Sequence, residues 1–133
     1  MRKICDKYGS VLVLILETQD YIQGEDKRFF SDAGDALQIG SLFFPQDSIV
    51  KPHIHKHKER SDDPMEILLL FRGRIEADIY DEEHKMVGVL DLKPGDILIQ
   101  KRGGHGFRFP VKATLLEIKL GPYDGRESDK EMI

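Results

Sequence analysis

Three of the five histidines of this chain fall within five residues, in the stretch Pro52-His53-Ile54-His55-Lys56-His57. In an extended strand, side chains alternate between two faces, so His53 and His55 point the same way while Ile54 points to the other side. Two imidazoles side by side on one face pack poorly in a core, whereas neutral imidazole is a common metal ligand. If the strand continued, His57 would join them. The stretch therefore predicts a metal site and leaves open which residues complete it.

Length and composition narrow the classes of protein that this chain could be. With 133 residues, 40% of them hydrophobic and 33% charged, it is typical of one soluble domain with one hydrophobic core. The net charge is −4 and the basic residues are scattered, so we expect no nucleic-acid partner. The single cysteine, Cys5, excludes an intramolecular disulfide and favours the cytoplasm. No stretch approaches the roughly 18 apolar residues of a membrane span, so we expect no membrane partner.

The elements that must position the histidines read as short strands between turns, and no stretch has the periodicity of a helix. The expected strands are 11–16, 37–44, 49–55, 66–75 with a break at Gly73, 77–80, 87–90, 97–100, 106–109 and 114–120. Pro94-Gly95-Asp96 predicts a tight turn, because proline presets φ and glycine tolerates positive φ. This spacing of strands and turns predicts an all-β sandwich or barrel in one domain, residues 1–133.

Four segments outside the central strands carry their own expectations. The continuous apolar run Val11–Leu16 predicts a strand buried on both faces. The charged segment Lys56–Asp63 predicts a solvated loop, and His84, within another charged connection, is expected to be exposed. The polar tail, residues 121–133, is expected to be frayed or draped over the surface.

The histidine pair and the residues that follow it resemble the two signatures of the cupin family. The first signature is a His-x-His pair, then a glutamate, then six residues and a glycine, and it matches His53-Ile54-His55, Glu66 and Gly73. The second is a proline-glycine turn, a short strand and a histidine, and it matches Pro94-Gly95-Asp96 and His105. Order, spacing and strand context all agree with the family.

The resemblance implies a small jelly-roll β-barrel over about residues 37–120, with one divalent metal in its interior. The metal ligands that the resemblance carries over are His53, His55, Glu66 and His105. Three imidazoles and one carboxylate suit Fe, Mn, Ni, Co, Cu or Zn, and they leave room for water or substrate. Ten residues separate His55 from Glu66, more than is usual in the family, so His57 is the alternative ligand to Glu66.

A cupin fold does not by itself name a reaction. The family that this chain resembles includes dioxygenases, sugar isomerases and epimerases, decarboxylases and non-catalytic modules. The end of the chain, from Leu115 onward, resembles small cupins of bacterial surface-polysaccharide biosynthesis. Polar side chains expected near the barrel mouth suit carboxylate or phosphate groups of a substrate. The expected substrate-binding residues are Arg72, Gln100, Arg108 and Tyr123.

These residues support one leading hypothesis and two alternatives, and they do not decide whether the chain is an enzyme. The leading hypothesis is a divalent-metal-binding cupin that binds or isomerises a small, polar, carbohydrate-like metabolite. The alternatives are a mononuclear iron dioxygenase and a non-catalytic ligand-binding or regulatory barrel. We expect a homodimer, since small cupins resemble one another in pairing through barrel faces or exchanged N-terminal strands. The run Val11–Leu16 suits such an exchanged strand or an internal strand of the monomer.

Overall fold

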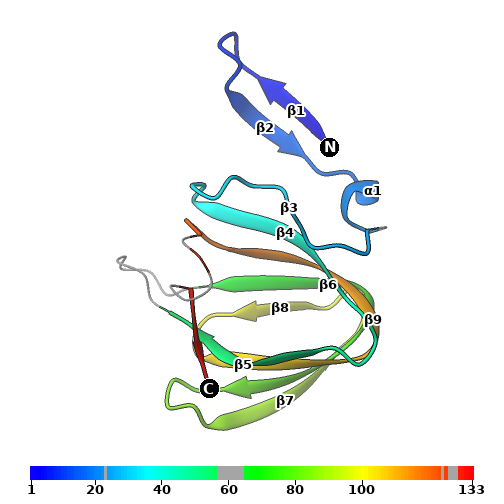
Figure 1. Cartoon of the computed structure of the whole chain (residues 1–133), viewed down its shortest axis with the longest axis vertical. Coiled ribbons are helices and arrows are strands. Elements are labelled where there is room, and N and C mark those ends of the chain that lie inside the picture. Colours follow the sequence, from blue (N-terminus) through cyan, green and yellow to red (C-terminus); the bar gives the residue numbers. More distant parts are fainter. Residues whose placement is uncertain (23, 57–64, 124, 126–128) are drawn as a thin grey trace.

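The computed structural model describes residues 1–22, 24–56, 65–123, 125 and 129–133. Strands make up most of this part of the chain, which has one four-residue helix, so the expected all-β class is confirmed (Figure 1). The elements in chain order are β1 (Arg2–Cys5), β2 (Val11–Ile15), α1 (Thr18–Tyr21), β3 (Arg28–Phe29), β4 (Leu37–Phe44), β5 (Ile49–His55), β6 (Glu66–Tyr80), β7 (Met86–Leu92), β8 (Ile97–Gln100), β9 (Gly104–Leu120) and β10 (Lys130–Met132). The charged segment at 57–64, with His57, lies outside the described residues.

Strand β9 is the central strand of the main sheet, because it pairs with three other strands. Its first part pairs with β5, its second part pairs with β4, and β6 runs antiparallel to it along most of its length. Strand β10 adds to the free edge of β5, and β3 adds to β4, while β7 and β8 pair with β6. All these pairs are antiparallel, and Figure 1 shows the strands curling around one interior.

Strand β6 is one long element where the sequence predicted two strands, and Gly73 explains the difference. In the first half the even-numbered residues, such as Leu68 and Leu70, point inward. In the second half the odd-numbered residues Ile75 and Ala77 point inward, so the alternation changes phase between the two halves. The register with β9 shifts on both sides of Gly73, which has φ +89°. A Cβ at Gly73 would lie 2.3 Å from the carbonyl oxygen of Lys112. Gly73 therefore marks a bulge that bends the strand and keeps apolar side chains inside, rather than a break.

Strand β9 is also longer than expected, since it joins the segments predicted at 106–109 and 114–120. Its odd-numbered residues, except the exposed Val111, are buried, which places His105 and Phe107 on the same face as Leu115, Glu117 and Lys119. This single strand therefore supplies a site histidine and two further buried ionisable residues, Glu117 and Lys119.

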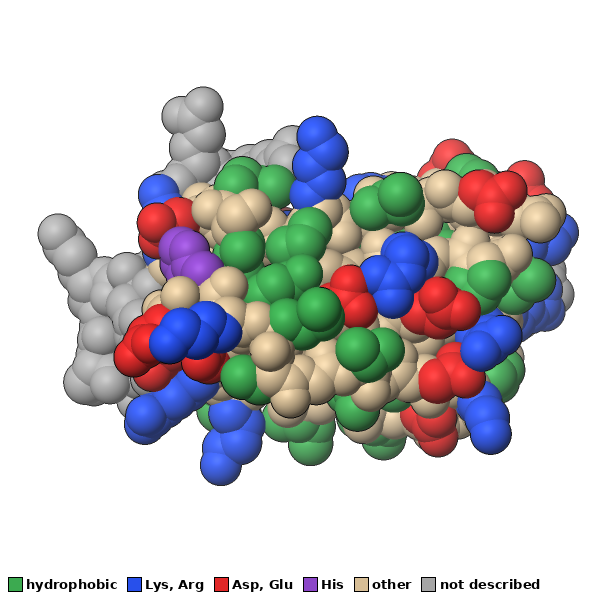
Figure 2. All heavy atoms as spheres, turned by 90° about the horizontal axis from the view of Figure 1, so that it is seen from below, with side chains coloured by type: hydrophobic (Ala, Val, Ile, Leu, Met, Phe, Trp, Pro, Cys, Tyr) green, Lys and Arg blue, Asp and Glu red, His purple; other side chains and the backbone are tan. Residues whose placement is uncertain are grey.

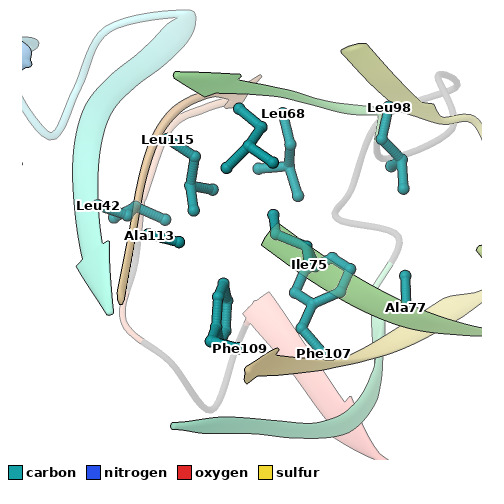
Figure 3. Packing of buried hydrophobic residues seen from close by; sticks show 10 residues of the cluster. Leu42, Leu68, Ile75, Ala77, Leu98, Phe107, Phe109, Ala113 and Leu115 are labelled. Carbon is teal, nitrogen blue, oxygen red and sulfur yellow. The ribbon is translucent and has the colours of Figure 1, made fainter. Parts of the chain in front are cut away.

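One cluster of buried apolar side chains forms the core, contributed by β4, β6, β8 and β9 (Figure 3). Its members are Leu42, Leu68, Leu70, Ile75, Ala77, Leu98, Phe107, Phe109, Ala113 and Leu115. Burying each large side chain of this kind stabilises the fold by about 1.5–3 kcal/mol. The remaining interior is polar, with buried histidine, glutamate, glutamine and lysine side chains. The barrel therefore has an apolar part that holds it together and a polar part that is available for chemistry.

The N-terminal run predicted as a buried strand is exposed instead. Strands β1 and β2 form a separate two-stranded sheet that pairs with no other strand of the described chain and projects from the barrel (Figure 1). Val11, Leu12 and Val13 are 51%, 64% and 45% exposed. The prediction of burial was wrong because a continuous apolar run is buried only where another element covers it, and among the described strands only β1 pairs with this one.

The C-terminal tail, predicted to be frayed or draped over the surface, contributes a paired strand. Lys130, Glu131 and Met132 pair in antiparallel register with His55, Ile54 and His53. Two further backbone hydrogen bonds flank the strand, from the Lys56 amide to the Asp129 carbonyl at 2.8 Å and from the Ile133 amide to the Pro52 carbonyl at 3.0 Å. The prediction was wrong here because an open edge of β5 supplies backbone partners that polar composition cannot reveal.

The outer surface also carries apolar side chains. Strand β7, at the bottom of Figure 1, exposes Met86, Val87, Val89 and Leu90. Figure 2 shows the face seen from below, on which apolar side chains gather in the middle with charged side chains around them. His84, in the turn before β7, is exposed as expected. Among the described residues, no helix has the length and hydropathy that crossing a membrane requires.

Candidate metal centre

Strand β5 presents His53 and His55 to the barrel interior, and this confirms the alternation expected from their spacing. Their exposed fractions are 3% and 5%, while Ile54 between them is only partly buried. The centroids of the two imidazole rings lie 5.1 Å apart. The pleat of one strand therefore places two buried imidazoles next to each other.

Strand β9 brings His105 beside this pair through its register with β5. His53 pairs with His105, and Ile54 pairs with Gly104. A Cβ at Gly104 would lie 2.3 Å from the carbonyl oxygen of His53, so only glycine allows the two strands to approach so closely. The His105 ring is 2% exposed and stacks on Phe107, with centroids 4.3 Å apart. The third imidazole thus packs directly against a side chain of the apolar core.

The three imidazoles converge on one point. One ring nitrogen from each of His53, His55 and His105 lies within 4.8 Å of the others. Nδ1 of His53 donates to the carbonyl oxygen of Lys51 at 2.8 Å, and Nδ1 of His105 donates to Oε1 of Gln100 at 3.3 Å. When Nδ1 carries the proton, the Nε2 lone pair is free to bind a metal. The local hydrogen bonds therefore select the tautomer that a metal site requires.

Glu66 adds a carboxylate to the same point. It is the first residue of β6, is 3% exposed, and shares the inward face of Leu68. Its Oε2 lies 3.1 Å from Nε2 of His55 and 3.4 Å from Nε2 of His105. The structure therefore brings together the four residues His53, His55, Glu66 and His105 that the resemblance implied.

The donor atoms at this point fit a divalent metal. Nε2 of His53, Nε2 of His55 and Oε2 of Glu66 are buried and have no hydrogen-bond partner among the described residues. The 3.1 Å contact between His55 and Glu66 is an ion-pair distance, but its geometry is not that of a hydrogen bond. Buried polar atoms without partners are unfavourable, and one ion bound between imidazole and carboxylate donors would satisfy them together.

Burial gives two of the imidazoles low proton affinity. It lowers the pKa of His53 to about 4 and that of His105 to about 3. Burial also opposes the charged form of His55, but contacts with Asp129 and Glu66 outweigh it and raise the pKa of His55 to about 9. At neutral pH, His53 and His105 are therefore neutral and able to bind a metal, while His55 must release a proton to do so.

A second carboxyl group, that of Glu117 on β9, lies next to Glu66. Burial alone would raise the pKa of Glu66, but His55 and His105 hold it well below its usual range. Burial, followed by the negative charge of Glu66, raises the pKa of Glu117. Two neighbouring carboxyl groups thus occupy different protonation states, because one faces imidazoles and the other faces a carboxylate.

A cavity of about 620 Å³ gives access to these groups. His53, His105 and Glu66 line one part of it, and Glu117 lines the wall beside them. Apolar side chains of the core form another part of the wall. Four amino groups also line the cavity, those of Lys27, Lys51, Lys119 and Lys130. The volume lies within the range of about 300–1,000 Å³ that is typical of small-molecule sites.

The four residues expected to bind substrate lie in different places. Tyr123 lines the cavity, with Nζ of Lys119 5.0 Å from its ring centroid. Gln100 is buried and accepts the hydrogen bond from His105, while its Nε2 donates to the carbonyl of Arg102, so it orients an imidazole. Arg72 is exposed and does not line the described cavity.

Arg108, the fourth of these residues, also lies away from the described cavity. Its guanidinium pairs with Asp78 through Nη1 and, at 3.1 Å, through Nη2, and with Glu76 at 3.3 Å. These contacts hold the pKa of Asp78 below its usual range. The side chain is thus committed to an ion-pair group on the outside of β6 and β9. His57, the alternative metal ligand, lies outside the described residues.

Two buried acidic residues near the site were not among those singled out from the sequence. Glu117 had a detectable signal, because period-two alternation along 114–120 places it on the same face as Leu115. Asp129 had none, because it belongs to a polar tail and its place follows from the pairing of β10 with the distant strand β5. Its Oδ2 lies 3.5 Å from Nδ1 of His55 and 3.1 Å from Nζ of Lys119.

No protein-family model matches this sequence, and no curated protein matches it. Solved structures do resemble it. The chain matches a cupin superfamily protein from Desulfitobacterium hafniense with a TM-score of 0.54 and 18% identity, over 71% of this chain and 74% of that chain. It matches a variant of oxalate decarboxylase from B. subtilis with a TM-score of 0.58 and 18% identity, over 74% of this chain and 24% of that chain.

An oxalate oxidase matches with a TM-score of 0.52 and 18% identity, over 68% of this chain and 44% of that chain. This chain therefore spans about a quarter of the oxalate decarboxylase and less than half of the oxalate oxidase. At such identities the likeness concerns the fold and not the activity. Together with the antiparallel all-β topology, it shows that this chain has the jelly-roll barrel fold of the cupins.

Proposed function

We propose that His53, His55, His105 and Glu66 hold one divalent transition metal, and that the protein binds a small, polar, carbohydrate-like metabolite there. The observation that carries this proposal is the convergence of buried donor atoms without hydrogen-bond partners at the wall of a cavity. A purely structural role explains neither feature, because a barrel core is more stable when it is apolar or fully hydrogen-bonded.

The donor set supports a metal without naming it. Three imidazoles and one carboxylate suit Fe, Mn, Ni, Co, Cu and Zn, and selection among them follows availability as well as ligand type. The negative charge of Glu66 offsets part of the ion's charge within the barrel. When bound, such an ion supplies a Lewis acid that polarises an oxygen atom of the ligand.

The cavity supports a metabolite that carries an acidic group. The sequence suggested arginines for this purpose, whereas in the structure the cationic groups that line the cavity are lysines. Lys27, Lys51 and Lys130 supply amino groups that can bind a carboxylate or a phosphate. Phe44 and Phe107 also line the cavity and can pack against the apolar face of a sugar ring.

Isomerisation or epimerisation is the reaction that we assign to this arrangement. Such a reaction removes a proton from one carbon of the metabolite and returns a proton to the same or a neighbouring carbon, so it needs no oxidant. Glu117 is the carboxyl group in the cavity wall that lies beside the proposed ligands, and we assign the proton transfer to it. Lys119, 3.9 Å from Oε1 of Glu117, keeps this carboxyl group in place.

A mononuclear iron dioxygenase is the second candidate. The same donor set suits iron, and one of the matched structures is an oxalate oxidase. The two functions differ in their need for oxygen, since isomerisation proceeds under anaerobic conditions and a dioxygenase consumes oxygen. A non-catalytic barrel is the third outcome, and it predicts stabilisation by ligand without turnover.

The first experiment is metal analysis by mass spectrometry on protein purified without a histidine tag or added metal. We expect close to one equivalent in the wild type and a large loss in His55→Ala. His84→Ala is the matched control, because His84 is an exposed histidine far from the cluster in sequence, and it should retain the metal. Absence of metal in the wild type, even after incubation with each candidate ion, would contradict the metal proposal.

The metal found then decides the activity assay. Iron directs the test to oxygen uptake, whereas zinc, nickel, cobalt or manganese directs it to the interconversion of acidic sugar isomers. Glu117→Gln should abolish interconversion while retaining metal, because it removes the proton-transferring group and keeps the shape of the side chain. Loss of metal in Glu117→Gln would contradict the role assigned to Glu117.

We also propose a cytoplasmic homodimer that covers the hairpin of β1 and β2. An isolated two-stranded hairpin with exposed Val11, Leu12 and Val13 is marginally stable in water, and a second copy would cover these side chains. Light scattering should report a dimer for the wild type and a shift toward monomer for Leu12→Lys. A wild-type monomer at all concentrations tested would contradict the dimer.

A further inference from the structure

The three site histidines differ in the group that faces their outer ring nitrogen. His53 donates to a backbone carbonyl, and His105 donates to the side-chain amide of Gln100. Only His55, among these three, faces a carboxylate, that of Asp129 at 3.5 Å. A carboxylate at this position orients the ring and makes it a stronger metal donor than a neutral partner does.

The C-terminal strand delivers this carboxylate. Asp129 directly precedes β10, whose Lys130 and Met132 pair with His55 and His53. The Asp129 carbonyl also accepts a hydrogen bond from the Lys56 amide at 2.8 Å. The same short segment therefore holds the backbone of the histidine strand and places a charged group against one of its imidazoles.

Asp129 is built into the interior rather than resting on the surface. Its exposed fraction is 5%, and its Oδ2 lies 3.1 Å from Nζ of Lys119, which is itself 8% exposed. A buried carboxylate between a lysine and a histidine is costly unless both partners stay in place, so its position is well defined.

We propose that Asp129 is a positioning residue for the metal ligand His55, and that β10 is therefore part of the metal centre. Asp129 holds the proton on Nδ1 of His55 and turns Nε2 toward the other donors. Because binding energies are reciprocal, metal binding and docking of the C-terminal strand stabilise each other. This inference rests on the proposed metal centre.

The test compares the affinities of four proteins for zinc and cobalt in a competitive chelator titration. The proteins are the wild type, Asp129→Ala, Asp129→Asn and Glu131→Ala. We expect Asp129→Ala to lose about 10- to 100-fold in affinity, the range typical of such outer partners. Asp129→Asn retains an oxygen acceptor without charge, so its loss should be smaller. Glu131→Ala is the matched control, because Glu131 lies only two residues further on, in β10, and is exposed, and the affinity of this variant should stay unchanged.

Two further readouts separate positioning from a general loss of stability. In ¹⁵N-histidine NMR spectra of the zinc-loaded protein, the Nδ1 resonance of His55 should shift in both Asp129 variants, while the resonances of His53 and His105 stay in place. In hydrogen-exchange experiments, bound metal should lower the exchange rates of the Lys56 and Ile133 amides, whose hydrogen bonds join β5 and the C-terminal segment. This slowing should be lost in Asp129→Ala and kept in Glu131→Ala.

Each outcome decides one question. A wild type that binds neither metal overturns the proposed centre itself. A wild type that binds, with equal affinity in Asp129→Ala, overturns the role of Asp129 and leaves the centre standing. If Asp129→Ala does not fold, Asp129→Asn carries the test, and wild-type affinity with an unshifted His55 resonance in that variant overturns the inference.

Discussion

The two ends of this chain use their side chains in opposite ways. The N-terminal strand β2 is a run of apolar residues, yet Val11, Leu12 and Val13 are largely exposed. The C-terminal segment is polar, yet Asp129 is 5% exposed and contacts a buried histidine and a buried lysine. Composition alone therefore gives the wrong burial at both ends.

The difference between the two ends lies in the partners that the barrel offers. The edge of β5 has open backbone groups, and β10 pairs with them in register with both histidines. The hairpin of β1 and β2 satisfies its backbone groups internally and finds no strand of the described barrel to join. A segment is thus drawn into the fold by available hydrogen-bond edges and by matching charges, as well as by its own hydrophobicity.

The largest effect should come from adding a methyl group at one glycine of the barrel, compared with one glycine of the hairpin. Gly104→Ala places a Cβ 2.3 Å from the backbone oxygen of His53, so β5 and β9 must separate. We expect a loss of more than about 4 kcal/mol of unfolding free energy together with loss of metal, since the clash is with backbone and can be relieved only by moving the paired strands apart. Gly9→Ala, in the hairpin turn at φ +85° with no atom within 4 Å, should cost only about 1–2 kcal/mol from backbone strain.

Denaturant unfolding and metal content of both glycine variants check this prediction. Equal losses for Gly9→Ala and Gly104→Ala would mean that the hairpin and the site strands are equally essential to the barrel. That result would contradict the contrast drawn between the two regions.

A smaller effect should come from shortening one leucine of the barrel core, compared with one leucine of the hairpin. Leu68 is 2% exposed within the core, and Leu68→Ala should lower the unfolding free energy by about 2–5 kcal/mol through lost burial and a residual cavity. Leu12 is 64% exposed, and Leu12→Ala should change it by less than about 0.5 kcal/mol under conditions where the protein is monomeric. Urea titration at low protein concentration provides the measurement. A large loss in Leu12→Ala at that concentration would show that the hairpin packs onto the barrel.

The smallest effect should be a pH dependence confined to the metal-free site. The pKa values of His53 and His105 fall to about 4 and about 3 from 6.5, so their contribution to stability is complete above pH 6.5 and is lost as the pH falls toward 4. The pKa of His55 rises to about 9, so its contribution is complete below pH 6.5 and is lost as the pH rises through 9. The raised pKa of Glu117 acts in the same direction as that of His55.

These opposed slopes predict a stability maximum near pH 6.5 for the metal-free protein. Chemical denaturation of chelator-treated protein between pH 4 and pH 9 should show it, and His55→Gln should weaken the decline on the alkaline side. Hydrogen exchange of the hairpin amides, corrected for intrinsic rates, should not follow the same profile. A flat stability between pH 6.5 and pH 9 would contradict the raised pKa of His55.

Much of the site could be predicted because its signals are local. Alternation on one strand decides that His53 and His55 share a face, and this holds in β5 whatever surrounds it. The matching of Glu66 and His105 to the cupin signatures placed them correctly beside the pair, since the spacing of strands and turns constrains which residues meet. Arg72 and Arg108 illustrate the opposite case, because residue type alone does not tell whether an arginine faces a cavity or an outer ion pair.

Tertiary structure decided what depends on pairing between distant segments. The continuous length of β6 and β9, the bulge at Gly73 and the exposure of the hairpin follow from which strand edges meet. The same pairing carries Asp129 to His55, across more than seventy residues of chain. The sequence by itself determined the strand class, the turns and the histidine face, because these follow from backbone geometry over a few residues. Only the folded barrel decided which polar groups became buried, because burial is a property of neighbours that the chain brings together.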